Sequence, residues 1–482
     1  MRKAKKCTIF CVIILLFSLI GTSLTGFAAF SPSFKTNSDG IYMVNLDTGI
    51  VVMSKNADKK LYPASTTKIM TCLVSLENIK DFNKKVECPY ECFNEFNNEN
   101  PNYYGPSTGA IEPLQENLTY NDCLYAMMLA SACEASNILA YNVAGSIEKF
   151  VDMMNETAQK IGCKSTHFAN THGLFDEENY TTAYDMYLIT KYAMDNYPGF
   201  MKICGTYEYD MPANDANPEG YTLTHTNYMM CSTSSYYYEG VSGVKTGSID
   251  RYYYKKNGEW DWDDYEYGSR ALVTTAEKNG YKYMLVTLGA PYCKADGSDT
   301  DSILSFTDHI NLYDWAFDEF EYTQVIEKNQ QVMLADVVLG KDADKVGIVT
   351  TEDYFTLMPK SIDKSSIQQI KPVIEPMNAP VEKGTKVGNL ELRLNGETLV
   401  KIPLATESDV ELDTVAQYKQ NLEAILKSPQ FIVSSIVLAA LIITWIVAFN
   451  INRRRRRLKS DMQRRRKINM APSNKYRNNR RR

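Results

Sequence analysis

The stretch that decides the fold runs from Pro63 to Thr71 and reads PASTTKIMT. It contains a Ser-x-x-Lys string, Ser65 to Lys68, at the head of a helical pattern that continues to about Leu76. Since residues three apart on a helix share a face, we expect the side chains of Ser65 and Lys68 to meet. The same string also begins at Ser146, Ser242 and Ser361, so the residues around it have to decide.

Two further strings follow in order. They are Ser131-Ala132-Cys133 and Lys245-Thr246-Gly247, the second on a predicted strand over 240–246. A serine needs a base to become a nucleophile, and a lysine enclosed among apolar or positive groups loses affinity for its proton and can act as that base. The three strings together indicate the active site of a serine acyl-transferase.

Each string also has a simpler interpretation. Ser65 alone could cap a helix while Lys68 stays solvated, and a lone Lys-Thr-Gly is more often a turn. On a strand, however, Lys245 would offer charge to a carboxylate and Thr246 a hydroxyl pointing the same way. Gly247 would let a substrate backbone lie close. The neighbouring residues favour the active-site interpretation.

The rest of the chain alternates helices and strands up to about residue 320 and then changes character. We expect a hairpin over 40–53, strands over 271–275 and 283–288, and helices over 65–76, 124–129, 138–144, 146–161, 182–193 and 310–317. Residues 250–268 are acidic and aromatic, and the sequence leaves open whether they touch glycan or only cover their own backbone. Short β runs dominate 323–407. The prediction is one domain over 30–320 and a small β-rich domain over 323–407.

The first 29 residues have the layout of a secretory signal peptide. Basic residues between Arg2 and Lys6 precede an apolar run from about Cys7 to Ile20, and small residues follow at Gly26 to Ala29. We expect cleavage near residues 28–29. A retained N-terminal anchor is the alternative, although its apolar core is short for a full span.

The C-terminal region predicts a membrane anchor. Residues 431–449 carry no charge and are long enough, at about 1.5 Å per residue, to cross the hydrocarbon layer. An amphipathic stalk helix over 413–429 precedes them. The tail, 450–482, holds 15 basic residues against the single acid Asp461, which places it in the cytoplasm by the positive-inside rule. Nucleic-acid binding is the alternative, but attraction to anionic lipid explains the clusters, and we expect no nucleic-acid partner.

Charge and cysteine usage narrow the function further. The whole chain carries −6, the first 29 residues +4 and the last 30 +14, which leaves −24 on residues 30–452. Such a region has no general attraction to an anionic polymer. Nine irregularly spaced cysteines would survive processing, which argues against a framework of paired disulfides. Cys88 and Cys92 could ligate a metal, but no second close pair supports this, so we expect neither metal nor cofactor.

Four stretches resemble the low-molecular-mass penicillin-binding proteins, the serine-type D-alanyl-D-alanine carboxypeptidases. They are PASTTKIMT at 63–71, GVSGVKTGS at 240–248, Thr171 to Leu174 with Tyr180 to Met186, and Leu288 to Pro291. Residues 383–407 resemble the β-rich C-terminal domain of the same proteins. The resemblance implies an α+β fold: a β-lactamase/transpeptidase-like domain, whose antiparallel sheet is flanked by helices with a helical subdomain, then a small all-β domain and one C-terminal transmembrane helix.

The resemblance also implies a reaction and its residues. Ser65 would be the acylated nucleophile, Lys68 its base and Ser131 a proton relay toward the leaving amine. Lys245 with Thr246 would hold the terminal carboxylate, Gly247 would also bind substrate, and the N–H groups of Ser65 and Ser248 would form the oxyanion hole. The implied partners are peptidoglycan stem peptides, with β-lactams as covalent inhibitors. No histidine is required, so His172 is interpreted as structural.

The chain departs from the family pattern twice. Cys133 stands at a substrate-binding position where the family expects Asn, and a thiol cannot reproduce an amide that both donates and accepts. Asn137, one turn later, substitutes only if the helix entry is shifted. Ser305 stands where many relatives carry Arg before the residue aligned with Phe306. These departures motivate the alternative of a catalytically attenuated relative that binds wall peptides as a recognition or scaffold protein. A β-lactamase is weaker, and DD-endopeptidase activity uses the same groups.

Overall fold

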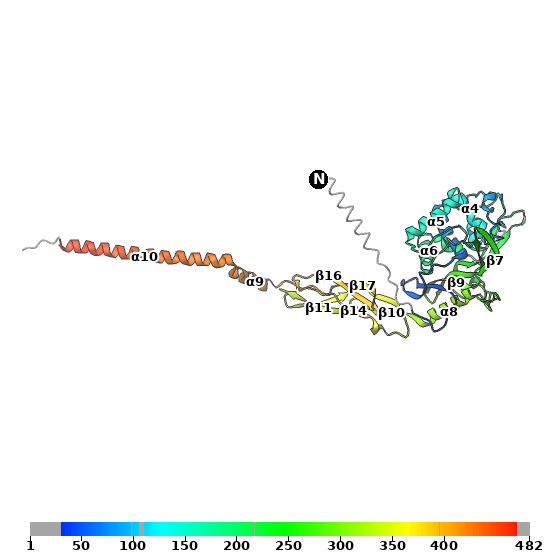
Figure 1. The fold of residues 1–482 in the computed structure, drawn as a ribbon. Helices are drawn as coiled ribbons and strands as arrows, with labels where there is room; N and C mark the ends of the chain where they lie inside the picture. Colours follow the sequence, from blue (N-terminus) through cyan, green and yellow to red (C-terminus); the bar gives the residue numbers. More distant parts are fainter. Residues whose placement is uncertain (1–29, 98, 106–109, 216, 395, 470–482) are drawn as a thin grey trace, which may run out of the picture. The chain divides into compact units, whose positions relative to one another are not determined.

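The computed structural model describes residues 30–97, 99–105, 110–215, 217–394 and 396–469 (Figure 1). The chain forms two compact units. The first holds the described residues up to Val325 with Tyr354–Gln368 and Leu392–Val400, and the second holds Ile326–Asp353, Gln369–Glu391 and the residues from Lys401 onward. The predicted signal peptide, 1–29, lies outside the described residues.

A five-stranded antiparallel sheet organises the first unit, in the order β2-β1-β9-β8-β5. Asp47-Thr48-Gly49 turns the chain between the first two strands, as the hairpin signal predicts, and Gly49 adopts φ 73°. The strand carrying Lys245 to Gly247 lies at the edge of the sheet, beside β8. The five strands are β1 (Gly40–Asn45), β2 (Val51–Lys55), β5 (Val241–Ser248), β8 (Ser269–Lys278) and β9 (Tyr281–Pro291).

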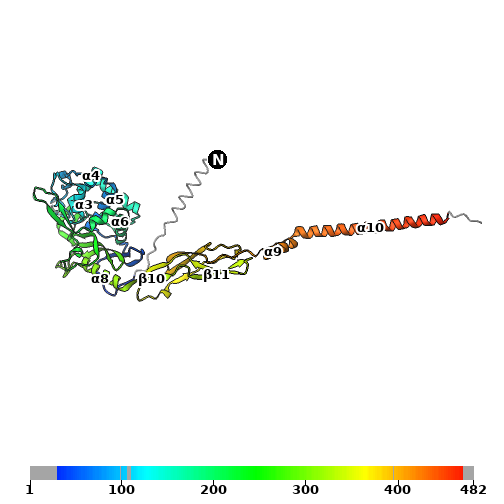
Figure 2. The same ribbon diagram turned by 180° about the vertical axis from the view of Figure 1, so that it is seen from behind.

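Alternation along the strands divides the core into two layers. Ile41 and Met43 face one side of β1, where they pack with residues of helix α8 (Leu304–Glu319). Tyr42 and Val44 face the other side, against the main helical layer. Figure 1 shows α4, α5 and α6 on one side of β9 and α8 on the other, and Figure 2 shows from behind that these three helices lie apart from α8. The sheet is therefore covered on both faces, as the α+β prediction requires.

The helical layer is longer than the sequence predicts. The helices expected over 124–129 and 138–144 begin earlier, at Tyr120 and at Cys133, and on the other face of the sheet the helix expected over 310–317 also begins earlier, at Leu304. A helix at Pro198–Cys204 and a hairpin of β3 (Glu208–Met211) and β4 (Tyr221–Thr224) were not predicted. The helices of this layer are α2 (Lys68–Asn78), α3 (Tyr120–Met128), α4 (Cys133–Ala144), α5 (Ile147–Ile161), α6 (Ala183–Asn196) and α7 (Pro198–Cys204).

The helix predicted to start at Ser65 starts three residues later. Residues Ala64–Thr67 form a 3₁₀ turn, η1, and α2 follows at Lys68. Ala64, immediately before the serine, has a left-handed backbone with φ 49°. A non-glycine residue rarely adopts this conformation, so the surrounding structure holds the turn in place.

The C-terminal part of the chain is rich in β-structure. A six-stranded sheet has the order β14-β16-β17-β12-β11-β15, and β10 (Phe320–Ile326) pairs with β13 (Tyr354–Pro359). These elements fall largely where the sequence predicts a small β-rich domain. The strands of the sheet are β11 (Gln331–Val338), β12 (Lys345–Thr350), β14 (Gln368–Ile370), β15 (Met377–Asn378), β16 (Lys386–Leu394) and β17 (Glu397–Thr406).

Two helices end the described chain. Asp413 caps α9 (Thr414–Lys427) by accepting hydrogen bonds from the N–H groups of Val415 and Ala416. The next helix, α10 (Pro429–Asn469), contains a candidate membrane span at Pro429–Arg466, with mean hydropathy 2.7 in its most apolar window and no part of that window buried. It includes the predicted span over 431–449 and continues as helix through Arg453 to Arg457, where the sequence predicts only a basic tail.

Candidate active site

The turn that carries Ser65 is held between two segments of main chain. A Cβ atom on Gly173, which has φ 83°, would lie 1.9 Å from the carbonyl oxygen of Ala64. On the other side, a Cβ atom on Gly247 would lie 2.9 Å from the carbonyl oxygen of Pro63. The sequence predicted that Gly247 makes room for the substrate backbone. The close approach in the structure is to the protein's own turn around Ser65, and Gly247 also lines the pocket.

Lys68 meets Ser65 as predicted. Its Nζ lies 3.1 Å from Ser65 Oγ, 2.6 Å from the carbonyl oxygen of His172 and 3.4 Å from Cys133 Sγ. Three neighbours match the three N–H bonds of an ammonium group. Burial lowers the pKa of Lys68 below its ordinary value, and the nearby Cys133 and Glu134 partly oppose this shift. The geometry suits a lysine that exchanges a proton with the serine hydroxyl.

His172 and its neighbours support the lysine from behind. The His172 Nδ1 accepts the N–H of Leu174 at 3.1 Å, which leaves the ring proton on Nε2, 3.2 Å from Glu95 Oε1. The Asn137 amide donates to the same Glu95 oxygen and to the carbonyl oxygen of Cys92. His172 is fully buried and acts through its main-chain carbonyl, in line with the structural interpretation.

Ser131 and Cys133 lie where α4 begins. Ser131 has φ 63° and lines the pocket, while Cys133 is the first residue of the helix rather than part of the connection before it. Burial raises the pKa of the Cys133 thiol, and the charge on Lys68 counteracts it. Asn137 is fully buried and bonded to Glu95 and Thr171, so the suggested substitution of Asn137 for the missing amide is wrong. The sulfur of Cys133 occupies that position beside the lysine.

Lys245 is fully buried within the edge strand β5. Its Nζ donates to the carbonyl oxygen of Thr246 at 3.1 Å. Burial, and next the positive charge on Lys68, hold the pKa of Lys245 well below its ordinary value. The neighbouring Thr246 hydroxyl lies 2.5 Å from the hydroxyl of Thr226. The positive charge of Lys68 is therefore close enough to Lys245 to disfavour its protonated form.

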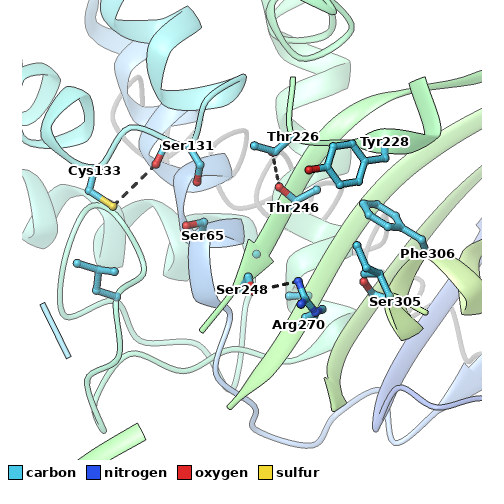
Figure 3. Close-up of a pocket in the computed structure, with 14 residues that line it drawn as sticks. Ser65, Ser131, Cys133, Thr226, Tyr228, Thr246, Ser248, Arg270, Ser305 and Phe306 are labelled. Atoms are coloured by element: carbon cyan, nitrogen blue, oxygen red, sulfur yellow. Dashed lines mark hydrogen bonds between the residues drawn. The ribbon is translucent and has the colours of Figure 1, made fainter. Parts of the chain in front are cut away.

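These residues surround a cavity of 340 Å³ (Figure 3). It brings together six of the eight predicted site residues. The other two predicted residues, Lys68 and Lys245, are fully buried and are not among the described residues that line the cavity. The lining residues are Ser65, Ser131, Cys133, Leu174, Thr226, Tyr228, Thr246, Gly247, Ser248, Arg270, Ala271, Ile303, Ser305 and Phe306.

Arg270 is the pocket residue that sequence reasoning missed. It lies opposite Ser248 in the register of β5 and β8, and its Nη1 donates to Ser248 Oγ at 3.3 Å (Figure 3). Its guanidinium stacks on the ring of Tyr292 at 4.2 Å. The buried Nε has no hydrogen-bond partner within the part of the chain that the structure describes. The sequence feature that could have identified Arg270 is its position immediately before the predicted strand over 271–275.

Ser305 also lines this pocket and is nearly fully buried. It belongs to the first turn of α8, and the ring of the next residue, Phe306, packs on Tyr228 and Tyr236 with centroids 5.8 and 5.2 Å away. The nine cysteines from Cys72 to Cys293 are all free. No group of three or more metal-binding side chains gathers within the described ranges, the vicinity of Cys88 and Cys92 included.

Comparison with known proteins places the chain in a family. Residues 27–255 match the model of D-alanyl-D-alanine carboxypeptidases, and residues 320–412 match that of the penicillin-binding protein 5 C-terminal domain. D-alanyl-D-alanine carboxypeptidase DacF of Bacillus subtilis is 29% identical over 407 residues, which cover 82% of this chain and 94% of the relative. D-alanyl-D-alanine carboxypeptidase of Streptomyces sp. strain K15 is 30% identical over 227 residues, which cover 43% of this chain and 71% of the relative.

Solved structures agree on the fold. Penicillin binding protein 5 from Haemophilus influenzae superposes with a TM-score of 0.55 at 22% identity, covering 80% of this chain and 100% of that one. The D-alanyl-D-alanine carboxypeptidase DacD from Francisella tularensis gives 0.56 at 21% identity, covering 81% and 98%. With its two matched domains and its relatives along most of its length, the chain belongs to the family of D-alanyl-D-alanine carboxypeptidases.

Proposed function

We propose that this enzyme removes the terminal D-alanine from peptidoglycan stem peptides through an acyl-enzyme on Ser65. The observation that carries the proposal is the 3.1 Å contact between Lys68 Nζ and Ser65 Oγ, beside a pocket that Ser131, Thr246 and Ser248 also line. A buried amine with a lowered pKa is the kind of base that a Ser-x-x-Lys nucleophile needs.

Acylation begins with the neutral form of Lys68. Its amine keeps two N–H bonds for the His172 carbonyl oxygen and Cys133, and its lone pair faces the Ser65 hydroxyl. As the proton moves to Lys68, Ser65 Oγ attacks the carbonyl carbon of the penultimate D-alanine. The N–H groups of Ser65 and Ser248 stabilise the oxyanion that forms.

Collapse of the tetrahedral intermediate releases the product. Ser131 relays the proton from Lys68 to the leaving nitrogen, the C–N bond breaks, and free D-alanine departs. Water then attacks the ester on Ser65 with Lys68 again as base, which restores the enzyme. A β-lactam acylates the same oxygen, but its leaving nitrogen stays tethered, which blocks the approach of water.

The carboxylate of the terminal D-alanine needs positive charge in the pocket. Lys245 lies beneath the surface, and Ser305 carries no charge. We assign this role to Arg270 together with the hydroxyl groups of Thr246 and Ser248, because its guanidinium already contacts Ser248 and lies in the same cavity. Arg270 thereby compensates for the arginine that relatives carry at the position of Ser305.

The proposed setting is the outer face of a cell membrane. Residues 1–29 act as a cleaved signal peptide, α10 spans the bilayer, and the basic residues from Arg453 onward remain in the cytoplasm. The acidic catalytic unit then works outside the cell, where its peptide substrate and β-lactams are found.

Two measurements on the purified full-length protein test the proposal. A fluorescent penicillin is expected to label Ser65, with the adduct mapped by mass spectrometry, and a stem pentapeptide is expected to lose D-alanine. Absence of both reactions would refute the proposal.

A catalytically attenuated binding protein is the second candidate, and the thiol beside Lys68 favours it. Cys133→Asn separates the two. For a working carboxypeptidase we expect less than a tenfold change in turnover, whereas a gain of more than a hundredfold would mean that the natural chain is attenuated.

A further inference from the structure

A two-stranded hairpin, β6 (Arg251–Lys256) and β7 (Glu259–Tyr267), begins three residues after the pocket residue Ser248. One of its faces is attached to the active-site loops. The buried ring of Tyr252 packs on Tyr62 and Phe175, with centroids 5.1 and 4.6 Å away, and Tyr254 packs on Phe175 at 5.3 Å. Since Tyr62 and Phe175 flank the Ser65 turn and the Leu174 wall, the hairpin is continuous with the pocket.

The opposite face carries a row of aromatic rings, which we call the aromatic ladder. Consecutive centroids lie 6.2 Å apart for Tyr104 and Trp262, 6.1 Å for Trp262 and Tyr253, 5.7 Å for Tyr253 and Tyr265, and 5.7 Å for Tyr265 and Tyr267. Strand periodicity places Tyr253 opposite in direction to Tyr252 and Tyr254. The ladder thus has its own face, turned away from the contacts that attach the hairpin.

Three of the five rings are exposed, while Tyr253 and Tyr265 between them are half-buried. The exposed fractions are 62% for Tyr104, 47% for Trp262 and 41% for Tyr267. Cross-strand aromatic pairs stabilise a hairpin, but that role does not require Tyr104, which comes from a separate loop and extends the row. A contiguous exposed aromatic patch typically marks a binding surface.

The charge of the hairpin limits the kinds of ligand that it can attract. Residues 250–268 hold six acids and three basic residues, a net charge of −3, and two of the cations already stack on rings: Arg251 on Tyr265 and Lys255 on Trp260. This balance disfavours anionic polymers and anionic lipid. Exposed rings with carboxylates such as Asp263 and Asp264 close by in the sequence suit a neutral polymer that offers C–H faces to rings and O–H or N–H groups to acceptors. Sugars have this chemistry.

We propose that the aromatic ladder binds the glycan strand of peptidoglycan while the pocket holds the stem peptide of the same strand. The proposal rests on the proposed function, because the link between the two sites is the substrate itself. A stem peptide of five residues spans at most about 17 Å, so its glycan has to lie near the pocket during acylation. The ladder would make the enzyme favour polymeric over soluble substrate.

The first test measures binding to glycan strands freed of their stem peptides, using the full-length protein in detergent. The variants are Trp262→Leu and Tyr104→Leu, which keep apolar bulk but lose the ring. The matched control is Tyr90→Leu, since Tyr90 is a similarly exposed tyrosine (61%) outside the ladder. We expect affinity to fall about three- to tenfold per ring for the ladder variants and to stay unchanged for the control. Equal binding by all four proteins would overturn the proposal.

The second test compares kcat/KM on polymeric peptidoglycan and on a soluble pentapeptide. Trp262→Leu is expected to lose about fivefold on the polymer and less than twofold on the pentapeptide, with unchanged penicillin labelling, and Trp262→Phe is expected to recover most of the loss. Equal losses on both substrates would mean that the ladder only supports the fold. Failure of the unaltered protein on the pentapeptide and the penicillin would instead refute the proposed function, while glycan binding stays measurable.

Discussion

The same four-residue string occurs at Ser65 to Lys68 and at Ser146 to Lys149, and the two copies have different roles. Ser146 is the N-cap of α5, where its Oγ accepts the N–H of Lys149 at 3.3 Å and the lysine side chain is exposed. Ser65 lies in a 3₁₀ turn, and its Oγ meets the buried amine of Lys68 itself. A serine that caps a helix turns toward main chain, whereas a nucleophile has to meet a side chain that solvent does not reach.

The other two copies support the comparison. Ser242 and Lys245 lie on β5 on either side of a shift in its register with β8, and the Nζ of Lys245 donates to the carbonyl oxygen of Thr246. Ser361 and Lys364 are both exposed. Only burial of the lysine within reach of the hydroxyl converts the string into a candidate catalytic pair.

The largest expected effect comes from removing the hydroxyl groups. Ser65→Ala is expected to abolish penicillin labelling and D-alanine release, because it removes the hydroxyl that we propose carries the acyl group. Ser146→Ala is the matched control and is expected to label as well as the unaltered protein. Labelling that survives in Ser65→Ala would place the nucleophile elsewhere.

The lysines give the next effect. Lys68→Arg keeps a charge that cannot be removed at neutral pH, so we expect acylation to slow by about 10²- to 10⁴-fold, while Lys149→Arg has no effect. Because the pKa of Lys68 is lowered, its neutral form appears at lower pH than that of a free lysine. The acylation rate, followed by stopped flow, is therefore expected to rise with pH through a pKa below 10.5. A rate that is independent of pH across this range would argue against Lys68 as base.

A variant at Arg270 tests the part of the site that is proposed to bind the substrate carboxylate. Arg270→Gln is expected to lower kcat/KM for a pentapeptide by about 10- to 100-fold, since a hydrogen bond to a charged group contributes roughly 1.5–3 kcal/mol. A peptide with an amidated C-terminus serves as control, because it has no carboxylate for Arg270 to bind. An equal loss on both peptides would assign Arg270 a structural role.

The smallest effect concerns the cap. Ser146→Ala removes one hydrogen bond at the start of α5, which costs about 1 kcal/mol of local stability. Hydrogen exchange of the first α5 amides is expected to become about fivefold faster, with unchanged rates in α2. Equal acceleration in both helices would mean that the cap supports the whole catalytic unit.

The sequence predicted the strands, the hairpin over 40–53 and the contact between Ser65 and Lys68, because each depends on local periodicity, whereas the antiparallel sheet was implied by the family resemblance. It did not predict Arg270 at the pocket, since only the pairing of β5 with β8 brings Arg270 opposite Ser248. It also did not predict the role of Glu95. This residue lies in a stretch without hydrophobic periodicity, and only the tertiary fold brings it to His172, 77 residues later in the chain. The position of Cys133 could not be predicted without knowing where α4 begins, and helix boundaries are hard to predict from a sequence pattern.

The main-chain contacts of Gly173 and Gly247 on either side of the Ser65 turn affect which β-lactams the pocket can accommodate. If Ser65 is the acylated residue as proposed, its turn has little room to shift for a large drug, because main chain lies against the carbonyl oxygens of Ala64 and Pro63. Strain from a bulky β-lactam side chain is therefore expected to fall on the side-chain walls of the pocket, such as Leu174, Tyr228 and Phe306. Differences in sensitivity between related drugs should follow the shape of those three side chains rather than the chemistry of the nucleophile.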